Sequence, residues 1–498
     1  MTTLKHHMLA GICSLGAVAL VLLLASANAQ TFTTLKSFGG WSNVTGRPFS
    51  KLVQGADGML YGTTTEDFSI VQGTVFRIQP DGSGFIVLRQ FTNSLEGASP
   101  SSVVVSGKVL YGTTLSGGVS DQGTVFKVNT DGTDYTVLKH FNTSDGTTPY
   151  ELTLSGGLLY GTTSGGGNSD RGTVFKMNID GSGYIVLKHF IGGSTGEYPQ
   201  AGLTLNDNIL YGTTSSGGIS NLGTVFKLNT DGSGYAVLKH FSGADGQYPH
   251  ATLTLSAGTL YGTTEIGGSS GPGTVFKLNT DGSGYTVLKH FTNNFERNPQ
   301  GQLTLDGGSL YATTFWGGSW GRGTVFKLNT DGSGYTILKH FTVDDGGQSR
   351  AGLTLSGSIL YGSTSGGGTM KAGTVFKLNT DGSDYTVLSS FTGRDGEWPH
   401  AGVVSSGGIL YGTTYWGGSP GPGTVFKVNS DGTGHTILKN FGELYGDGRG
   451  PYAGFVSLLA DGHVYSRPGP GQFRQTVCSR LSRNPGLGQK AAGAGSSG

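Results

Sequence analysis

The chain lacks an excess of charge of either sign. It carries 32 lysine and arginine residues against 31 aspartate and glutamate residues, for a net charge of +1. A surface that binds nucleic acid or an anionic membrane is typically basic. The charge balance therefore argues against both kinds of partner.

Cysteine is almost absent as well, since Cys13 and Cys478 are the only two. Residues 1–29 have the pattern of a secretory signal peptide, with an apolar run followed by a small-x-small cleavage site that ends at Ala29. Its removal takes Cys13 away, so the mature chain cannot form an intramolecular disulfide. An exported protein of this kind must be stabilised by packing alone.

Long hydrophobic runs are absent after the signal, and no later stretch is apolar over the length that spans a bilayer. An uncleaved membrane anchor is the alternative interpretation of residues 1–29. We expect a monomer that is secreted, periplasmic or on the cell surface, with no integral membrane segment once the signal is removed.

Helical periodicity is also missing outside the signal, and repetition takes its place. The tetrapeptide Gly-Thr-Val-Phe begins at Gly73, Gly123, Gly172, Gly223, Gly273, Gly323, Gly373 and Gly423. The motif Leu-Tyr-(Gly/Ala)-(Thr/Ser)-Thr begins at Leu60, Leu110, Leu159, Leu210, Leu260, Leu310, Leu360 and Leu410. A fixed period of about 50 residues indicates a solenoid, a propeller or an array of identical units.

Each unit predicts four short antiparallel strands, as residues 251–291 illustrate. Residues 251–255 and 273–279 alternate polar and apolar side chains, as half-buried strands do. Residues 259–264 and 285–291 are the second and fourth strands, and an Asp-Gly hairpin turn precedes the fourth. Four-stranded units in tandem predict an all-β fold, the β-propeller. An open β-solenoid is the alternative.

The two ends of the repeat region complement each other. Residues 32–38 match the fourth strand of a unit, whereas residues 455–459 and 463–466 match the first and second strands. The pattern predicts a propeller over residues 30–466, with eight complete blades and one split closing blade. A propeller of eight blades alone is the alternative.

Units that read LYGTTSGGG and GTVFKLNTDGSGYTVLKHF resemble the GloVer tandem repeat of exported "choice-of-anchor" bacterial proteins, over roughly residues 32–466. The double glycine after the second strand is similar to that of kelch-like propeller blades. The resemblance implies a bacterial exported protein, often with a C-terminal anchor, and no established catalytic residues. Residues 467–498 depart from it: they show no anchor, and their basic Gly/Pro/Ser-rich composition predicts a disordered tail. A scrambled reading frame would look the same.

Three chemical motifs have simpler interpretations. Gly-x-Ser-x-Gly occurs three times, but in glycine-rich loops without the strand-to-helix elbow of a nucleophile. The histidines at one repeat position fall on different blades, so they cannot converge on a metal ion. The loop at residues 279–284 is similar to a calcium loop but lacks a later carboxylate, and a hairpin needs the same residues. We predict no catalytic residues, no metal and no cofactor.

The tryptophans all fall in one set of loops, those that join strand two to three and strand four to one. These are Trp316, Trp320 and Trp416 in the first kind of loop, and Trp41 and Trp398 in the second. The loops of the opposite face are nearly identical from unit to unit. Exposed aromatic residues on varied loops are typical of binding sites, although tryptophans that fill gaps between blades are equally consistent.

One repeat position, just before each first strand, should surround the mouth of the channel. It is occupied by Ser50, Pro100, Tyr150, Gln200, His250, Gln300, Arg350, His400 and Tyr452. These residues are mostly polar or aromatic and differ from blade to blade, as a ligand pocket on a repeated frame would.

Three functions remain open from the sequence. The leading interpretation is a non-catalytic binding module that takes a glycan or a protein on its tryptophan-rich face. A polysaccharide lyase or hydrolase is the second, and it would draw on His250, His400, Asp245, Asp395 and Glu397, which lack a recognisable constellation. A structural surface protein is the third.

Overall fold

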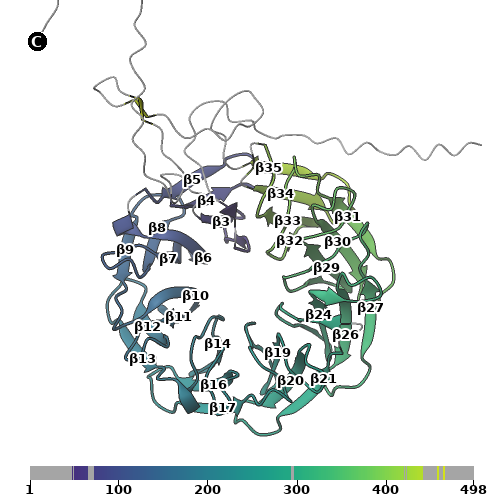
Figure 1. Cartoon of the computed structure of the whole chain (residues 1–498). Coiled ribbons are helices and arrows are strands. Elements are labelled where there is room, and N and C mark those ends of the chain that lie inside the picture. Colours follow the sequence, from purple (N-terminus) through teal and green to yellow (C-terminus); the bar gives the residue numbers. More distant parts are fainter. Residues whose placement is uncertain are drawn as a thin grey trace, which may run out of the picture. The chain divides into compact units, whose positions relative to one another are not determined.

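The computed structural model describes residues 47–48, 50–65, 72–92, 94–292, 296–419, 421, 423–440, 457–458 and 464–465. The chain divides into two units, Met1–Leu444 and Tyr445–Gly498. Within the first unit, eight antiparallel sheets stand around a common axis (Figure 1). The prediction of an all-β propeller is therefore confirmed, and the open solenoid is excluded.

The strands run outward from the axis in chain order. The first four blades comprise β1 (Arg47–Pro48), β2 (Val53–Gln54), β3 (Leu60–Thr65), β4 (Thr74–Ile78) and β5 (Ile86–Gln90); β6 (Ala98–Ser106), β7 (Val109–Ser116), β8 (Thr124–Asn129) and β9 (Thr136–His140); β10 (Thr147–Ser155), β11 (Leu158–Gly165), β12 (Thr173–Asn178) and β13 (Ile185–His189); and β14 (Thr204–Asn206), β15 (Ile209–Thr214), β16 (Thr224–Asn229) and β17 (Ala236–His240).

The last four blades follow the same order. They comprise β18 (Thr254–Ser256), β19 (Thr259–Thr264), β20 (Thr274–Asn279) and β21 (Thr286–His290); β23 (Thr304–Asp306), β24 (Ser309–Thr314), β26 (Thr324–Asn329) and β27 (Thr336–His340); β28 (Thr354–Ser356), β29 (Ile359–Thr364), β30 (Thr374–Asn379) and β31 (Thr386–Ser390); and β32 (Val404–Ser406), β33 (Ile409–Thr414), β34 (Thr424–Asn429) and β35 (Thr436–Asn440). A small sheet joins β22 (Glu296–Arg297) to β25 (Trp316–Gly317), and two short 3-10 helices, Ser94–Glu96 and Gly193–Thr195, lie in loops.

The two repeated motifs form the middle of each blade. In the fifth blade Gly262 pairs with Phe276 across β19 and β20, and a Cβ atom at Gly262 would lie only 2.5 Å from Cζ of that phenylalanine. The glycine therefore leaves room for the ring. Beside it, the hydroxyls of Thr264 and Thr274 lie 2.8 Å apart in a buried hydrogen bond, and the same pair recurs in every blade.

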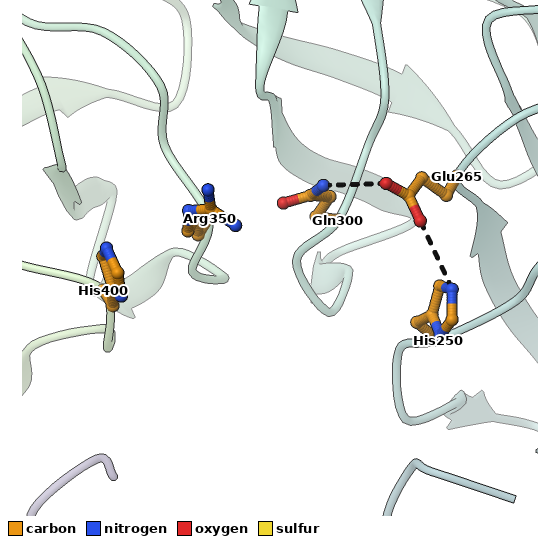
Figure 2. A pocket seen from close by; sticks show the side chains of 5 residues that line it. All are labelled: His250, Glu265, Gln300, Arg350 and His400. Atoms are coloured by element: carbon orange, nitrogen blue, oxygen red, sulfur yellow. Dashed lines mark hydrogen bonds and ion pairs between the residues drawn. The ribbon is translucent and has the colours of Figure 1, made fainter. Parts of the chain in front are cut away.

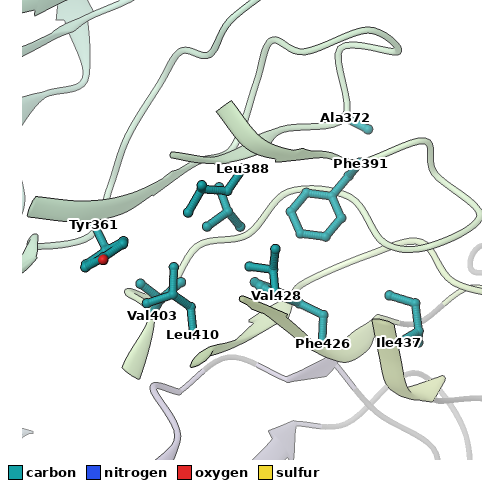
Figure 3. Close-up of a cluster of buried hydrophobic side chains, with 10 residues drawn as sticks. Tyr361, Ala372, Leu388, Phe391, Val403, Leu410, Phe426, Val428 and Ile437 are labelled. Carbon is teal, nitrogen blue, oxygen red and sulfur yellow. The ribbon is translucent and has the colours of Figure 1, made fainter. Parts of the chain in front are cut away.

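The hydrophobic core lies between the blades, as one cluster at each junction. Figure 3 shows the cluster that joins the seventh blade to the eighth, where Phe391 at the end of one blade packs on Phe426 of the next. Their ring centroids are 5.0 Å apart in an edge-to-face arrangement, which is a favourable geometry for aromatic pairs. Each blade thus buries its faces only against its neighbours.

Around the channel, threonine hydroxyls of the innermost strands tie consecutive blades together. They donate to backbone carbonyls of the next blade at 2.5–2.8 Å, from Thr153 to Leu203, Thr204 to Leu253, Thr254 to Leu303, Thr304 to Leu353 and Thr354 to Val403. Val53, Val104 and Val404 occupy the corresponding position in the first, second and eighth blades. These threonine hydrogen bonds therefore link the third blade through to the eighth, whereas valine at the same position cannot donate one.

The ring closes with eight blades, so the split ninth blade is a correction to the sequence analysis. Leu60 and Phe76 of the first blade share one buried cluster with Tyr411, Val425 and Leu438 of the eighth. In Figure 1, β4 and β34 accordingly stand side by side. Among the described residues, no sheet of the ring combines strands from the two ends of the chain. Closure depends on side-chain packing, because Tyr411, Val425 and Phe76 occupy the repeat positions of Tyr211, Val225 and Phe276 at the junction between the fourth and fifth blades.

Several segments for which the sequence makes predictions are not among the described residues. Residues 1–29, 32–38 and 467–498 lie outside the described residues, as do Trp41 and Tyr452. In the second unit, β36 (Ser457–Leu458) and β37 (Val464–Tyr465) pair as an antiparallel hairpin, within the two segments predicted as strands. No helix in the described part of the chain has the length and apolar character needed to cross a membrane.

Candidate functional site at the channel mouth

Four residues from the variable repeat position before the first strands come together at the mouth of the channel. His250, Gln300, Arg350 and His400, joined by Glu265, line one cavity of about 410 Å³ (Figure 2). Each ring residue precedes the innermost strand of a different blade, so four consecutive blades contribute to one site. The cavity lies within the range of roughly 300–1,000 Å³ that small-molecule sites occupy.

A chain of hydrogen bonds orders one side of the cavity. Gln200 Oε1 lies 3.1 Å from Nδ1 of His250, and Nε2 of the same imidazole lies 3.3 Å from a carboxylate oxygen of Glu265. Gln300 Nε2 donates to the other Glu265 oxygen at 3.0 Å. The hydrogen bond from His250, more than any other interaction, lowers the pKa of Glu265 from its usual value. Glu265 is therefore an ionised acceptor whose two oxygens both have partners.

Aromatic rings support the other side. The Arg350 guanidinium lies over the ring of Phe315, with Cζ 4.5 Å from the centroid. His400 stacks on Tyr415 at 4.9 Å and 12°. Burial, with a smaller contribution from the charge of Arg350, lowers the pKa of His400 to about 4. At neutral pH this imidazole is thus uncharged and offers one donor and one acceptor.

The sequence analysis missed Glu265, Phe315 and Tyr415. All three occupy the position directly after the Leu-Tyr-(Gly/Ala)-(Thr/Ser)-Thr motif, which reads Thr65, Leu115, Ser164, Ser215, Glu265, Phe315, Ser365 and Tyr415 around the ring. The residue at that position varies from blade to blade as much as the residue just before each first strand does. Its variation was the available signal, but only the folded ring shows that the two positions face the same cavity.

Other residues at the repeat position before the first strands lie outside this cavity. Ser50 and Tyr150 line a second cavity of about 500 Å³ together with Lys51 and Glu151, and His400 lies on the wall of both cavities. Pro100 packs at the junction with the first blade, where its Cδ lies 2.5 Å from the place of a Cβ at Gly73. Burial lowers the pKa of Lys51 and raises that of Glu151, and the attraction between the two charges partly offsets both shifts.

None of the four tryptophans among the described residues lines the mouth cavity. Trp316 and Trp416 directly follow Phe315 and Tyr415, with each pair of neighbouring rings edge to face, and successive side chains on an extended segment point in opposite directions. Trp316, Trp320 and Trp398 are exposed at 36%, 68% and 44%. They form an aromatic rim on the same loops that carry the site.

The repeated histidines have a local role. Within their own blades, the Nδ1 atoms of four of them accept hydrogen bonds from loop N–H groups, at distances such as 3.1 Å for His290 and 3.2 Å for His340. The aspartate of the hairpin turn is likewise engaged, since Asp281 accepts from the Ser283 N–H at 2.8 Å. Among the described residues, no group of three metal-ligating side chains converges.

Similarity to a solved structure supports the fold. The chain is similar to the computationally designed Ika8 protein, with a TM-score of 0.51 and 14% identity, over 77% of this chain and 97% of that one. It also resembles the GH74 enzyme of Niastella koreensis (TM-score 0.42, 14% identity, 81% and 74% covered) and a puromycin-hydrolyzing peptidase of Mycobacterium tuberculosis (0.46, 11%, 77% and 62%). No match was found among curated proteins.

The sequence match is more specific than the structural one. The model of the Gloeobacter/Verrucomicrobia repeat matches residues 22–221, 152–358 and 299–471. These overlapping matches cover the whole ring of blades and agree with the GloVer resemblance seen in the repeats. The chain belongs to the Gloeobacter/Verrucomicrobia repeat family.

Proposed function

We propose that this protein is an exported, non-catalytic binding module whose ligand, a glycan, occupies the cavity at the channel mouth. The observation that carries the proposal is the convergence of His250, Glu265, Gln300, Arg350 and His400 from four blades on one cavity. The motifs that form the middle of each blade repeat nearly the same residues, whereas these positions differ from blade to blade.

The chemistry of the cavity fits a polyhydroxylated ligand. Gln300 and His400 provide donors and acceptors, while Phe315 and Tyr415 hold the neighbouring side chains in place. Rings with polar partners are typical of sites for amphipathic ligands. The exposed Trp316 and Trp398 extend the same surface outward, where a longer glycan would continue.

A glycan array with the purified propeller tests this function. Binding should be lost in Gln300→Ala and His400→Ala. It should persist in Asp306→Asn, which changes an exposed residue of the opposite face. If no glycan binds and a protein partner is captured through the same residues, the ligand class is wrong although the site is right. Loss of binding in the control variant as well would contradict the site.

Catalysis at the same cavity is the second candidate, because His250 and Glu265 form a pair of the kind that transfers protons. Incubating each bound glycan with the protein and searching for shorter or unsaturated products separates the two functions. Turnover that Glu265→Gln abolishes would establish the enzyme. Unchanged glycans would leave binding as the function.

A further inference from the structure

Arg350 has no ion-pair partner among the described residues, whereas Arg89 and Arg171 pair with Glu96 and Glu197. The side chain is exposed at the mouth. A cation held in a cavity without a direct ion pair is available to a ligand.

Phe315 orients this cation without using its hydrogen bonds. The ring is 8% exposed and lies beneath the guanidinium, with 4.5 Å between Cζ and the ring centroid. Contact with an aromatic face attracts the positive charge and leaves the N–H groups at the edge of the guanidinium free to donate. These donors match two oxygens of one oxyanion, such as a carboxylate, which arginine binds through two parallel hydrogen bonds.

The acidic side of the cavity does not compete for Arg350. Both oxygens of Glu265 are held by His250 and Gln300. Because Gln300 donates through Nε2 to Glu265, its Oε1 remains as an acceptor, and Figure 2 shows this oxygen directed toward Arg350. A ligand that presents an oxyanion to Arg350 and a hydroxyl to Gln300 would match both.

We propose that the mouth cavity recognises an acidic saccharide, with an oxyanion of the sugar bound to the guanidinium of Arg350 and a neighbouring hydroxyl bound to Gln300. The inference rests on the proposed glycan-binding function and narrows its ligand. A carboxylate of a uronic acid and a sulfate ester share this chemistry. A longer ligand would continue past His400, which also borders the second cavity, lined in part by Lys51.

Titration calorimetry with matched probes tests the inference. The probes are a uronic-acid oligosaccharide, the same oligosaccharide with its carboxyl groups reduced to alcohols, and a sulfated neutral oligosaccharide of equal length. The proteins are the wild type, Arg350→Gln and Arg394→Gln. Arg394 is an exposed arginine of a loop on the same face, so its removal changes the net charge equally without touching the cavity.

We expect the wild type and Arg394→Gln to bind an acidic probe at least about tenfold more tightly than the reduced one, as the loss of a charge-assisted pair requires. Arg350→Gln should bind all probes alike, with unchanged thermal unfolding. Preference for the sulfated over the uronic-acid probe would identify sulfate as the oxyanion. Equal binding of acidic and reduced probes by the wild type would overturn the inference but leave glycan binding intact. No binding of any probe would contradict both.

Discussion

Asp395 is a buried carboxylate whose lysine partner is replaced by Ser389. At three other junctions the pair is intact, as Lys139–Asp145, Lys239–Asp245 and Lys339–Asp345. There the lysine also lies over a tyrosine ring, as Lys339 does over Tyr385. The hydroxyl of Tyr385 donates to the backbone carbonyl of Asp345. Between the seventh and eighth blades His435 replaces that tyrosine, and one oxygen of Asp395 has no protein partner among the described residues.

This junction should therefore be weaker than its neighbours. Ser389→Lys combined with His435→Tyr restores the arrangement of Lys339 and Tyr385, and a partner for a buried polar atom is worth roughly 1–3 kcal/mol. We expect the double variant to unfold at higher denaturant concentration than the wild type. The reverse exchange, Lys339→Ser with Tyr385→His, is the matched control and should destabilise. A double variant no more stable than the wild type would contradict this account.

The same junction should be sensitive to acid. Burial lowers the pKa of His435 from 6.5 to about 4, although the charge of Asp395 acts in the opposite direction. The unfolded chain therefore binds a proton in this window that the folded chain does not. The free energy of unfolding should fall as the pH drops from about 6.5 to about 4. His400 contributes in the same direction, because its pKa is also lowered to about 4.

Thermal unfolding of the wild type and His435→Tyr across this pH range checks the expectation. Tyrosine does not titrate there, so the variant should lose less stability on acidification. Parallel curves for the two proteins would show that His435 does not couple folding to protonation.

Closure of the ring predicts that the junction between the eighth and first blades is as strong as the one between the fourth and fifth. Phe76 lies in the cluster between the eighth and first blades, and Phe276 lies at the same place between the fourth and fifth. Replacing either ring by alanine should cost about 3–5 kcal/mol, since both are fully buried. Chemical denaturation compares the two. A clearly smaller effect of Phe76→Ala would show that the ring is open in solution.

Trp316 and Trp416 should contribute to binding more than to stability. Trp316→Ala and Trp416→Ala are expected to weaken a glycan about tenfold or more, by analogy with aromatic stacking on nucleic-acid bases, at about 1–3 kcal/mol per base. Their loops carry little of the core. Normal binding with easier unfolding would instead identify them as packing residues. Calorimetry and thermal unfolding of the same samples distinguish these outcomes.

Export is tested at the N-terminus of the mature protein. Cleavage is expected between Ala29 and Gln30, because the small-x-small motif ends there. Mass spectrometry of the exported chain should find Gln30 as its first residue. A chain that retains Met1 would support the membrane-anchor interpretation.

By itself, the sequence determined the architecture of the blade. Repeated Gly-Thr-Val-Phe and Leu-Tyr-Gly-Thr-Thr segments specify strands, buried faces and turns locally, through side-chain alternation and glycine at positions such as Gly262 where a neighbouring ring leaves no space. A repeat period cannot state how many blades close a circle, because that depends on the angle between packed neighbours. That Phe76 and Leu438 share one buried cluster, and that the ring therefore has eight blades, is apparent only in the folded molecule.

The residues of the candidate site were likewise only partly predictable from the sequence. The variable ring before the first strands, with His250, Gln300, Arg350 and His400, was readable from the sequence. The contribution of Glu265 was not, because it lies 15 positions from His250 in the chain yet binds both His250 and Gln300 across two blades. Which side chains share one cavity is set by the radius and packing of the closed ring, and these are properties of all eight blades together.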